Sequence, residues 1–210
     1  MSPFSTELVV AMCAVAINYG ATFRFPATEL LKDPVTTLST AVPTLLIAHL
    51  SLVVLALALR RSLQHVISSL GYTLVAIAAA TGVIYGLTVL FGAPLLTKFY
   101  HTLAFSAYLA ILSVVPAFAI LAPTNVSNWI KVFVQHCPST RAEIYAYTQV
   151  VCTLSGAWIG AIVLPLDWER DWQAWPISCI ISTFLGHVVG VIAGFGWTSF
   201  KYVFSKKKNE

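Results

Sequence analysis

Charged residues are scarce in this chain. Lysine, arginine, aspartate and glutamate make up 10% of its 210 residues, against 58% hydrophobic residues and a mean hydropathy of +0.83. Soluble domains carry roughly 25% charged residues, so this composition excludes a water-exposed globule. No polar stretch is long enough to form a second, soluble core. We therefore expect one integral membrane domain over residues 1–210.

Patterns that support catalysis or metal binding are also missing. The five histidines are scattered singly, the four cysteines show no C-x-x-C spacing, and neither a phosphate-binding glycine loop nor a G-x-S-x-G pattern occurs. We therefore predict no catalytic residue, no metal site and no cofactor. The start of the chain lacks the basic region of a removable signal peptide, so we expect its first apolar run to remain as an anchor.

Long apolar runs are abundant. A helix needs roughly 20 apolar residues to cross about 30 Å of hydrocarbon. Backbone polar groups in lipid must be paired within the segment, which favours helices. The sequence predicts an all-α integral membrane protein, a bundle of about six transmembrane helices. The runs lie at about residues 7–23, 38–59, 70–92, 100–122, 145–166 and 176–198, followed by a basic tail at 199–210.

Basic residues predict the orientation of the bundle. Six spans put both termini on one side, and the positive-inside tendency favours the cytosol for that side. The opposite side then receives only Arg24, Lys32, Lys98 and Arg170. The cytosolic segments receive Arg60, Arg61, Lys131, Arg141, Lys201, Lys206, Lys207 and Lys208.

The end of the tail has two interpretations. Lys207 and Lys208, followed by two more residues, resemble the dilysine signal that returns membrane proteins to the endoplasmic reticulum. A basic flank attracted to anionic lipid headgroups explains the same lysines without any address.

Small residues recur at helical spacing in the last two runs. Gly156 and Gly160 are four residues apart, and Gly186, Gly190 and Gly194 repeat the same interval. Such stripes let helix backbones approach closely in lipid. The five glycines are therefore predicted to pack against a helix, either within this bundle or in a separate membrane partner.

The densest charge in the chain lies between the last two runs, in PLDWERDWQAWP at residues 165–176. A reaction site, a membrane-surface anchor and a docking surface for another protein all fit this composition. If the segment is helical, Trp168, Trp172 and Trp175 share one face and the carboxylates lie beside them. Trp rings at headgroup depth are typical of a surface anchor. A catalytic role lacks a nucleophile or metal ligand to support it.

This segment resembles a known signature. The stretch GAWIGAIVLPLDWERDWQAWPISC, residues 156–179, is similar to the PIG-F family pattern GAW-x-GA-x-x-x-PLDW-x-R-x-WQ-x-WP. FGAP at 91–94 and VVP…LAP at 114–123 add support, and the resemblance extends over about residues 70–198. Asp171 departs from the pattern, because family members often have proline there.

The resemblance implies a small multi-span subunit in the endoplasmic reticulum membrane. Such subunits bind and stabilise large GPI ethanolamine phosphate transferases, whose catalytic domains are metal-dependent and lumenal. The chain itself is then not an enzyme, its partners are the transferase, membrane lipid and the GPI precursor, and no nucleic acid is expected. The partner-binding set implied is Asp167, Trp168, Arg170, Trp172, Gln173, Trp175 and Pro176.

An alternative is a lipid-handling protein that acts on GPI precursors, either a small transferase or a scramblase-like carrier. Asn18, His49 and His187 fall within predicted spans, where polar side chains are costly and often functional. The same side chains also suit plain hydrogen bonds between helices.

Overall fold

The computed structural model describes residues 3–58, 63–121, 125–166 and 168–208. Every regular element among them is helical, which confirms the predicted all-α class. The elements are α1 (Pro3–Tyr19), the π-helical turn η1 (Gly20–Arg24), α2 (Pro34–Ala58), α3 (Leu63–Leu90), α4 (Phe99–Ile120), α5 (Val126–Trp129), the π-helical turn η2 (Ile130–Val134), α6 (Arg141–Ile162), the 3₁₀ turn η3 (Asp171–Gln173) and α7 (Ile177–Lys208).

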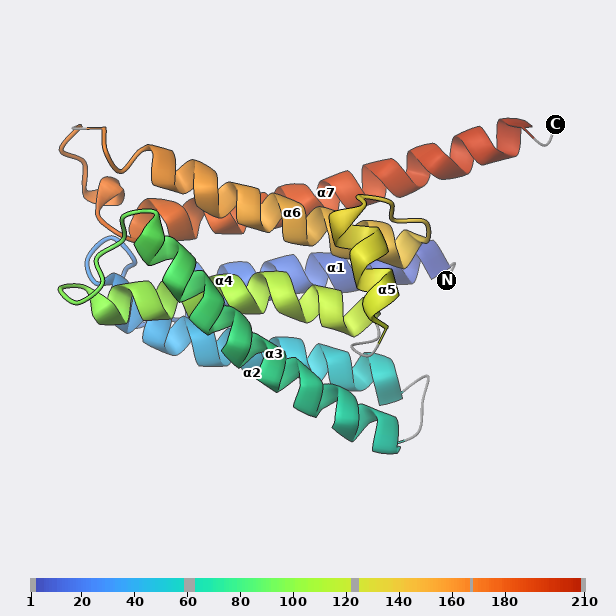
Figure 1. Ribbon diagram of the computed structural model, residues 1–210, viewed down its shortest axis with the longest axis horizontal. Helices are drawn as coiled ribbons and strands as arrows, with labels where there is room; N and C mark the ends of the chain where they lie inside the picture. Colours follow the sequence, from blue (N-terminus) through green and yellow to red (C-terminus); the bar gives the residue numbers. More distant parts are fainter. Residues whose placement is uncertain (1–2, 59–62, 122–124, 167, 209–210) are drawn as a thin grey trace.

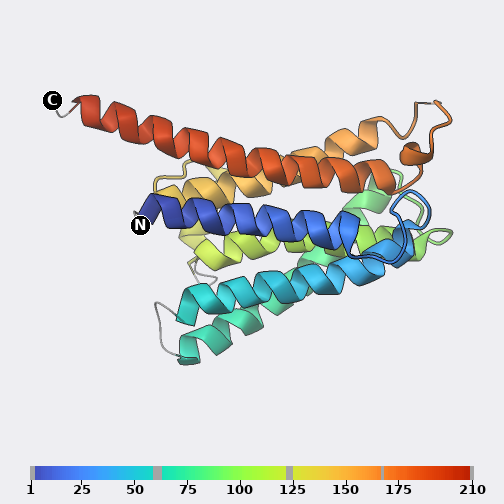
Figure 2. The same ribbon diagram turned by 180° about the vertical axis from the view of Figure 1, so that it is seen from behind.

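The long helices run up and down beside one another. Each of the six predicted runs coincides with one of them: α1, α2, α3, α4, α6 and α7. Both termini lie at one end of the bundle, here called the terminal end, and α7 projects beyond it (Figures 1 and 2). The connections 25–33, 91–98 and 163–176 gather at the opposite end, the loop end.

Within the described residues, four helices are long and apolar enough to cross a membrane. The candidate spans are Pro34–Leu52, Leu70–Leu90, Phe99–Phe118 and Ile177–Lys201. The α-helical part of α1 has only 17 residues, fewer than the roughly 20 that a span needs. Tyrosines, threonines and Gln149 make α6 less apolar than these four.

Helix α4 lies at the centre of the bundle and contacts α2, α3, α6 and α7. Its Phe105, Tyr108, Ile111 and Leu112 are fully buried. The Tyr108 hydroxyl accepts a hydrogen bond from Thr22 Oγ1 (3.3 Å), so even this polar group is paired in the interior. The central position of α4 makes it the support for the helices around it.

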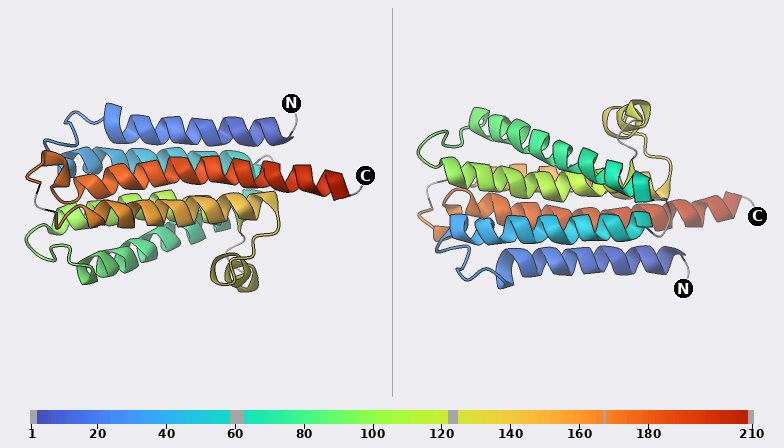
Figure 3. Two further views of the ribbon diagram at one scale, coloured as in Figure 1. Left: turned by 90° about the horizontal axis from the view of Figure 1, so that it is seen from above. Right: turned by 90° about the horizontal axis from the view of Figure 1, so that it is seen from below.

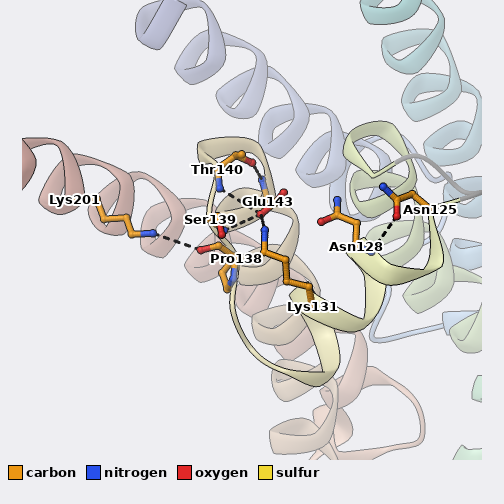
Figure 4. A network of polar contacts seen from close by, with 8 residues as sticks. All are labelled: Asn125, Asn128, Lys131, Pro138, Ser139, Thr140, Glu143 and Lys201. Carbon is orange, nitrogen blue, oxygen red and sulfur yellow. Dashed lines mark hydrogen bonds and ion pairs between the residues drawn. The ribbon is translucent and has the colours of Figure 1, made fainter.

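At the terminal end, α5 and η2 lie across the direction of the long helices (Figures 1 and 3). Figure 4 shows how they are fastened to α6. Glu143 accepts hydrogen bonds from the Ser139 N–H (2.7 Å) and from Lys131 Nζ (3.2 Å). Lys201 of α7 donates to the Pro138 carbonyl (3.4 Å). Both contacts connect the 126–140 segment to the last two helices.

Glu143 also begins α6. Its backbone N–H donates to Thr140 Oγ1 (3.2 Å), while its carboxylate receives the Thr140 N–H (3.3 Å), which makes a capping box. Burial raises the pKa of Glu143, but the hydrogen bonds from Ser139, Lys131 and Thr140 outweigh it, and the pKa lies below its usual value. The carboxylate therefore stabilises the folded chain in its charged form.

Candidate functional site

The 163–176 loop joins α6 to α7 at the loop end. Its only helical residues among those described are the single turn Asp171–Gln173. Glu169 adopts a positive φ of 49°, and the Trp175–Pro176 peptide bond is cis. The helix considered from the i, i+4, i+7 spacing of the three tryptophans is therefore wrong for residues 168–176. Asp167, one of the predicted site residues, lies outside the described part of the chain.

Gln173 closes the loop on itself. Its side-chain NH₂ donates to the carbonyls of Val163 (2.9 Å) and Leu166, and its oxygen accepts the N–H of Arg170 (3.2 Å). The side-chain amide of Gln173 thus uses both its NH₂ donors and its carbonyl oxygen for hydrogen bonds within the loop. This use of Gln173 leaves it little capacity for contacts with another molecule.

Trp175 fastens the loop to the bundle. Its indole N–H donates to Thr102 Oγ1 (3.0 Å), and its ring packs edge-on against Phe105 with centroids 5.3 Å apart. Thr102 in turn bonds the Pro94 carbonyl (3.2 Å), so the loop 91–98 is connected as well. Pro176 is buried at the start of α7. Sequence reasoning missed Thr102 because nothing local to it signals this long-range contact.

Trp168 and Arg170 face outward. Trp168 is 54% exposed, and the side chains of Glu169, Arg170 and Asp171 are exposed around it. Trp172 is half-buried against the core and meets the Trp168 ring at 5.9 Å with planes 61° apart. The predicted set therefore divides into side chains held inside the molecule and side chains presented by the loop.

The five predicted packing glycines all lie where α6 meets α7, the most extensive helix contact in the chain. Gly156 faces Gly186: a Cβ atom built on either residue would lie 3.0 Å from the other's Cα. The same added atom would also collide with a backbone carbonyl, that of Ser182 or Cys152 respectively. Only glycine permits this approach.

The contact continues along both helices. A Cβ at Gly160 would lie 2.7 Å from the Ser178 carbonyl, one at Gly190 2.8 Å from the Thr148 carbonyl, and one at Gly194 2.9 Å from Thr148 Oγ1. Ser178 Oγ also donates across the interface to the Gly160 carbonyl (2.9 Å). These contacts place all five glycines against this chain's own helices.

The polar residues predicted within spans meet in the bundle interior. Asn18 of α1 accepts a hydrogen bond from His49 Nε2 of α2 (2.7 Å), and its NH₂ lies 3.0 Å from His187 Nε2 of α7. All three are buried. Since His187 Nε2 accepts, its proton lies on Nδ1, which has no hydrogen-bond partner among the described residues. Asn18 therefore links three helices.

The remaining candidate residues add no further cluster. Within the described ranges, no three His, Cys, Asp or Glu side chains lie close enough to share a metal ion. The backbone of Lys207 and Lys208 forms the last turn of α7, while their side chains lie outside the described part of the structure.

The described part of this chain is a bundle of helices, four of them long and apolar enough to cross a membrane, with a charged and aromatic loop at one end. The class is therefore an all-helical membrane protein. Residues 10–195 match the model of the GPI biosynthesis protein family Pig-F, so the chain belongs to this family. This confirms the resemblance that the 156–179 signature indicated.

Named relatives give the same result. The chain is 32% identical to glycosylphosphatidylinositol anchor biosynthesis protein 11 of Yarrowia lipolytica, over 92% of this chain and 88% of the relative. It is 33% identical to the GPI ethanolamine phosphate transferase, stabilizing subunit, of Mus musculus, over 66% of this chain and 63% of that protein. The human protein of the same name is 37% identical over 52% and 49%. No solved structure shows significant similarity to this chain.

Proposed function

We propose that this chain is a noncatalytic accessory subunit that stabilises a GPI ethanolamine phosphate transferase and so supports phosphoethanolamine addition to mannose of the GPI precursor. Family membership and the names of the mammalian relatives support this role. The partner is the large catalytic subunit, with which the chain forms a hetero-oligomer.

The observation that carries the proposal is the exposure of Trp168 and Arg170 on a loop that is attached to the bundle through Gln173 and Trp175. Gln173 and Trp175 hold the loop from within, through bonds to its own backbone and to α4. A loop ordered before binding loses less conformational entropy when the partner docks. Exposed Trp and Arg are the residue types that most often dominate the energy of an interface. The half-buried ring of Trp172 contacts the ring of Trp168 edge-on.

The proposed topology has six spans, with the terminal end in the cytosol and the loop end in the lumen of the endoplasmic reticulum. Most of the Lys and Arg residues in the described part of the chain belong to segments at the terminal end (Figure 1), as the positive-inside tendency favours. Lys207 and Lys208 would then be available to the cytosolic retrieval machinery. The docking loop would face the lumen.

Glycosylation tests this topology. Asn125 begins the sequon Asn125-Val126-Ser127 near the terminal end, and its side chain is exposed. We expect no glycan there, whereas a sequon introduced into the 91–98 loop, on a short spacer that clears the membrane, should acquire one. An endoglycosidase-sensitive glycan on Asn125 would contradict the proposed orientation.

Two substitutions test docking. Trp168→Ala removes an exposed aromatic surface, and Arg170→Glu reverses the charge beside it. Anchors of this kind contribute about 2 kcal/mol or more each, so quantitative pull-down should recover at least about tenfold less transferase. GPI-anchored surface proteins should fall with it. The small subunit should stay in the membrane, because its helices are untouched.

Matched controls lie at the same end of the molecule. Phe25→Ala removes a ring that is 71% exposed, and Lys32→Glu reverses an exposed charge whose only described ion pair is local, with Glu29. Neither should change recovery. Normal recovery with both Trp168→Ala and Arg170→Glu would sink the docking proposal, and lost transfer activity at normal recovery would indicate catalysis instead.

The lipid-handling alternative rests on the Asn18–His49–His187 cluster, since polar groups inside a bundle can mark a substrate path. The chain purified without a transferase, in vesicles carrying a fluorescent phospholipid, distinguishes the two functions. The accessory role predicts lipid transfer and scrambling equal to protein-free vesicles. Activity abolished by Asn18→Leu would favour the alternative.

A further inference from the structure

A short helical segment crosses the bundle at its terminal end. Helix α5 and the turn η2 follow each other without a break over residues 126–134, here called the transverse segment. It lies across the direction of the long helices (Figures 1 and 3). Helix α4 contains a candidate membrane span, so a segment that lies across α4 runs along the plane of the bilayer.

The contact of Trp129 with α4 fixes the depth of the transverse segment. The Trp129 ring lies against the ring of Phe118, with centroids 4.8 Å apart. Phe118 is the last residue of the candidate span Phe99–Phe118. The transverse segment is therefore level with the end of the apolar part of α4. At this depth hydrocarbon gives way to headgroups, and tryptophan is enriched there in membrane proteins.

One side of the transverse segment faces the bundle. Val132 is fully buried. The Phe133 ring stacks on Tyr147 of α6 with centroids 6.3 Å apart, and it also contacts the ring of Trp129. These contacts hold the segment against α4 and α6, so its orientation across the spans is set by packing.

A second side is apolar and uncovered. Val126, Ile130 and Val134 are 63%, 43% and 70% exposed. They are four residues apart, so they share one face of the segment. The stripe extends over about 12 Å of helix. Because the segment runs along the bilayer plane, all three side chains lie at about the same depth.

A third side is polar. Ser127 and Gln135 are exposed, and Lys131 lies between them in sequence at the same four-residue spacing. Lys131 Nζ donates to Glu143 in the first turn of α6 (3.2 Å), which directs this side toward the terminal end. Among the described side chains at this end, exposed Arg141 and Lys201 add two further cations. Their charge complements the phosphate groups that phospholipid headgroups carry.

The orientation of the stripe selects its occupant. A partner helix that spans the membrane would have to cross the transverse segment steeply, and near-perpendicular crossings are rare among packed helices. The bilayer boundary, by contrast, meets all three side chains at one depth. Amphipathic helices that lie in this boundary place their apolar face among the fatty chains and their polar face toward water. The transverse segment has this arrangement.

We propose that the transverse segment is an in-plane membrane anchor. Val126, Ile130 and Val134 insert between headgroups and fatty chains of the leaflet at the terminal end. The anchor fixes the depth at which α4 ends and α6 begins. It depends neither on the accessory function proposed above nor on which side of the membrane the terminal end faces.

Spin labels test the anchor in the full chain. Single cysteines at positions 126, 130 and 134 are labelled after the exposed Cys13 and Cys137 have been changed to alanine. In lipid nanodiscs, each label reports collisions with oxygen, which concentrates in hydrocarbon, and with a water-soluble nickel chelate. The oxygen-to-nickel ratio should be severalfold higher at these positions than at the exposed polar positions 127 and 135. The protein that keeps only Cys152 and Cys179 reports background labelling.

A matched pair of variants sharpens the test. Ile130→Glu puts a charge in the middle of the stripe and should lower the ratio severalfold at positions 126 and 134. Ser127→Glu puts the same charge on the polar side and should leave both ratios unchanged. If Ile130→Glu does not fold, the labels in the chain without it still decide.

Two results would overturn the proposal. Equal ratios at the stripe and at positions 127 and 135 would place the stripe in water. Slow collisions with both reagents at the stripe would show that protein covers it, so that the occupant is a partner. Samples with and without co-purified transferase are compared, and transferase recovery is measured in the same preparations. Failure of the anchor is thereby separated from failure of the accessory role.

Discussion

Gly156 and Gly160 of α6 and Gly186 and Gly190 of α7 lie against a neighbouring backbone, whereas the glycines of α3 face open space. A Cβ added at Gly186 would meet α6 at once, but one added at Gly82 or Gly86 would find no atom within 4 Å. The spans differ accordingly: 61% of the α7 span is buried inside the molecule, against 11% of the α3 span. Glycines at the same four-residue spacing thus allow close helix contact in one region and lie on an uncovered helix face in the other.

This difference teaches where the chain's own stability resides. Helix α6 packs closely against α7, and Asn18 joins α1 to α2 and to α7. Helix α3 leans mainly on α4 and leaves its other face uncovered. Substitutions in the α6–α7 contact should therefore change the stability more than substitutions in α3. At the glycines, the two changes in stability should also have opposite signs.

The largest effect is expected at the glycine contact. Gly186→Ala places a methyl group against the α6 backbone, and overpacking of this kind costs typically 1–3 kcal/mol. Gly82→Ala is the matched control. Alanine reduces the conformational entropy of the unfolded chain and has room in this open helix position, so it should stabilise the folded protein by about 0.4–1 kcal/mol. We expect a lower melting temperature in detergent for Gly186→Ala and a higher one for Gly82→Ala. Size-exclusion chromatography of heated samples measures both.

Equal shifts for the two alanine variants would break the comparison. The α6–α7 contact would then be loose enough to accept a side chain, and close approach would not distinguish it from the outer face of α3.

A smaller effect is expected at the buried polar link. Asn18→Leu leaves His49 and His187 without the partner that joins them. A buried polar group without a hydrogen-bond partner costs about 1–3 kcal/mol of stability. Hydrogen bonds between helices in membranes contribute about 0.6 kcal/mol on average, so the loss should be smaller than at Gly186. Thr81→Val in α3 removes only a bond to the Ile77 carbonyl of its own helix and should be nearly neutral. Thermal unfolding measures both, and an Asn18→Leu variant as stable as Thr81→Val would show that the link contributes nothing.

The smallest effect concerns pH. The pKa of Glu143 is lowered in the folded chain, so its contribution is present above the unfolded value of about 4.3 and is lost as the pH falls through the folded value. Melting temperatures at pH 7 and below pH 4 should differ less in Glu143→Gln than in the wild type. Glu29→Gln is the control, since the Glu29–Lys32 pair is exposed and contributes little. An unchanged pH dependence in Glu143→Gln would contradict the assignment.

Much of the fold and of the candidate site follows from sequence. The six long apolar runs predict the six long helices, with boundaries that differ mostly by a few residues, because hydropathy and helix formation are local properties. The signature at 156–179 identifies the family, since it depends on residue types and spacing alone. The glycine spacing in α6 and α7 likewise predicts helix packing.

Only the tertiary structure decided which glycines are covered, because Gly82 and Gly86 share the spacing of Gly186 and Gly190 and differ solely in having no neighbouring helix. It also separated Trp168 from Trp175, two indoles of one motif. Trp175 is held by Thr102, 73 positions away in sequence, and Trp168 stays exposed. A periodic pattern reports which face of a helix a residue occupies, whereas the packing of distant segments determines what that face meets.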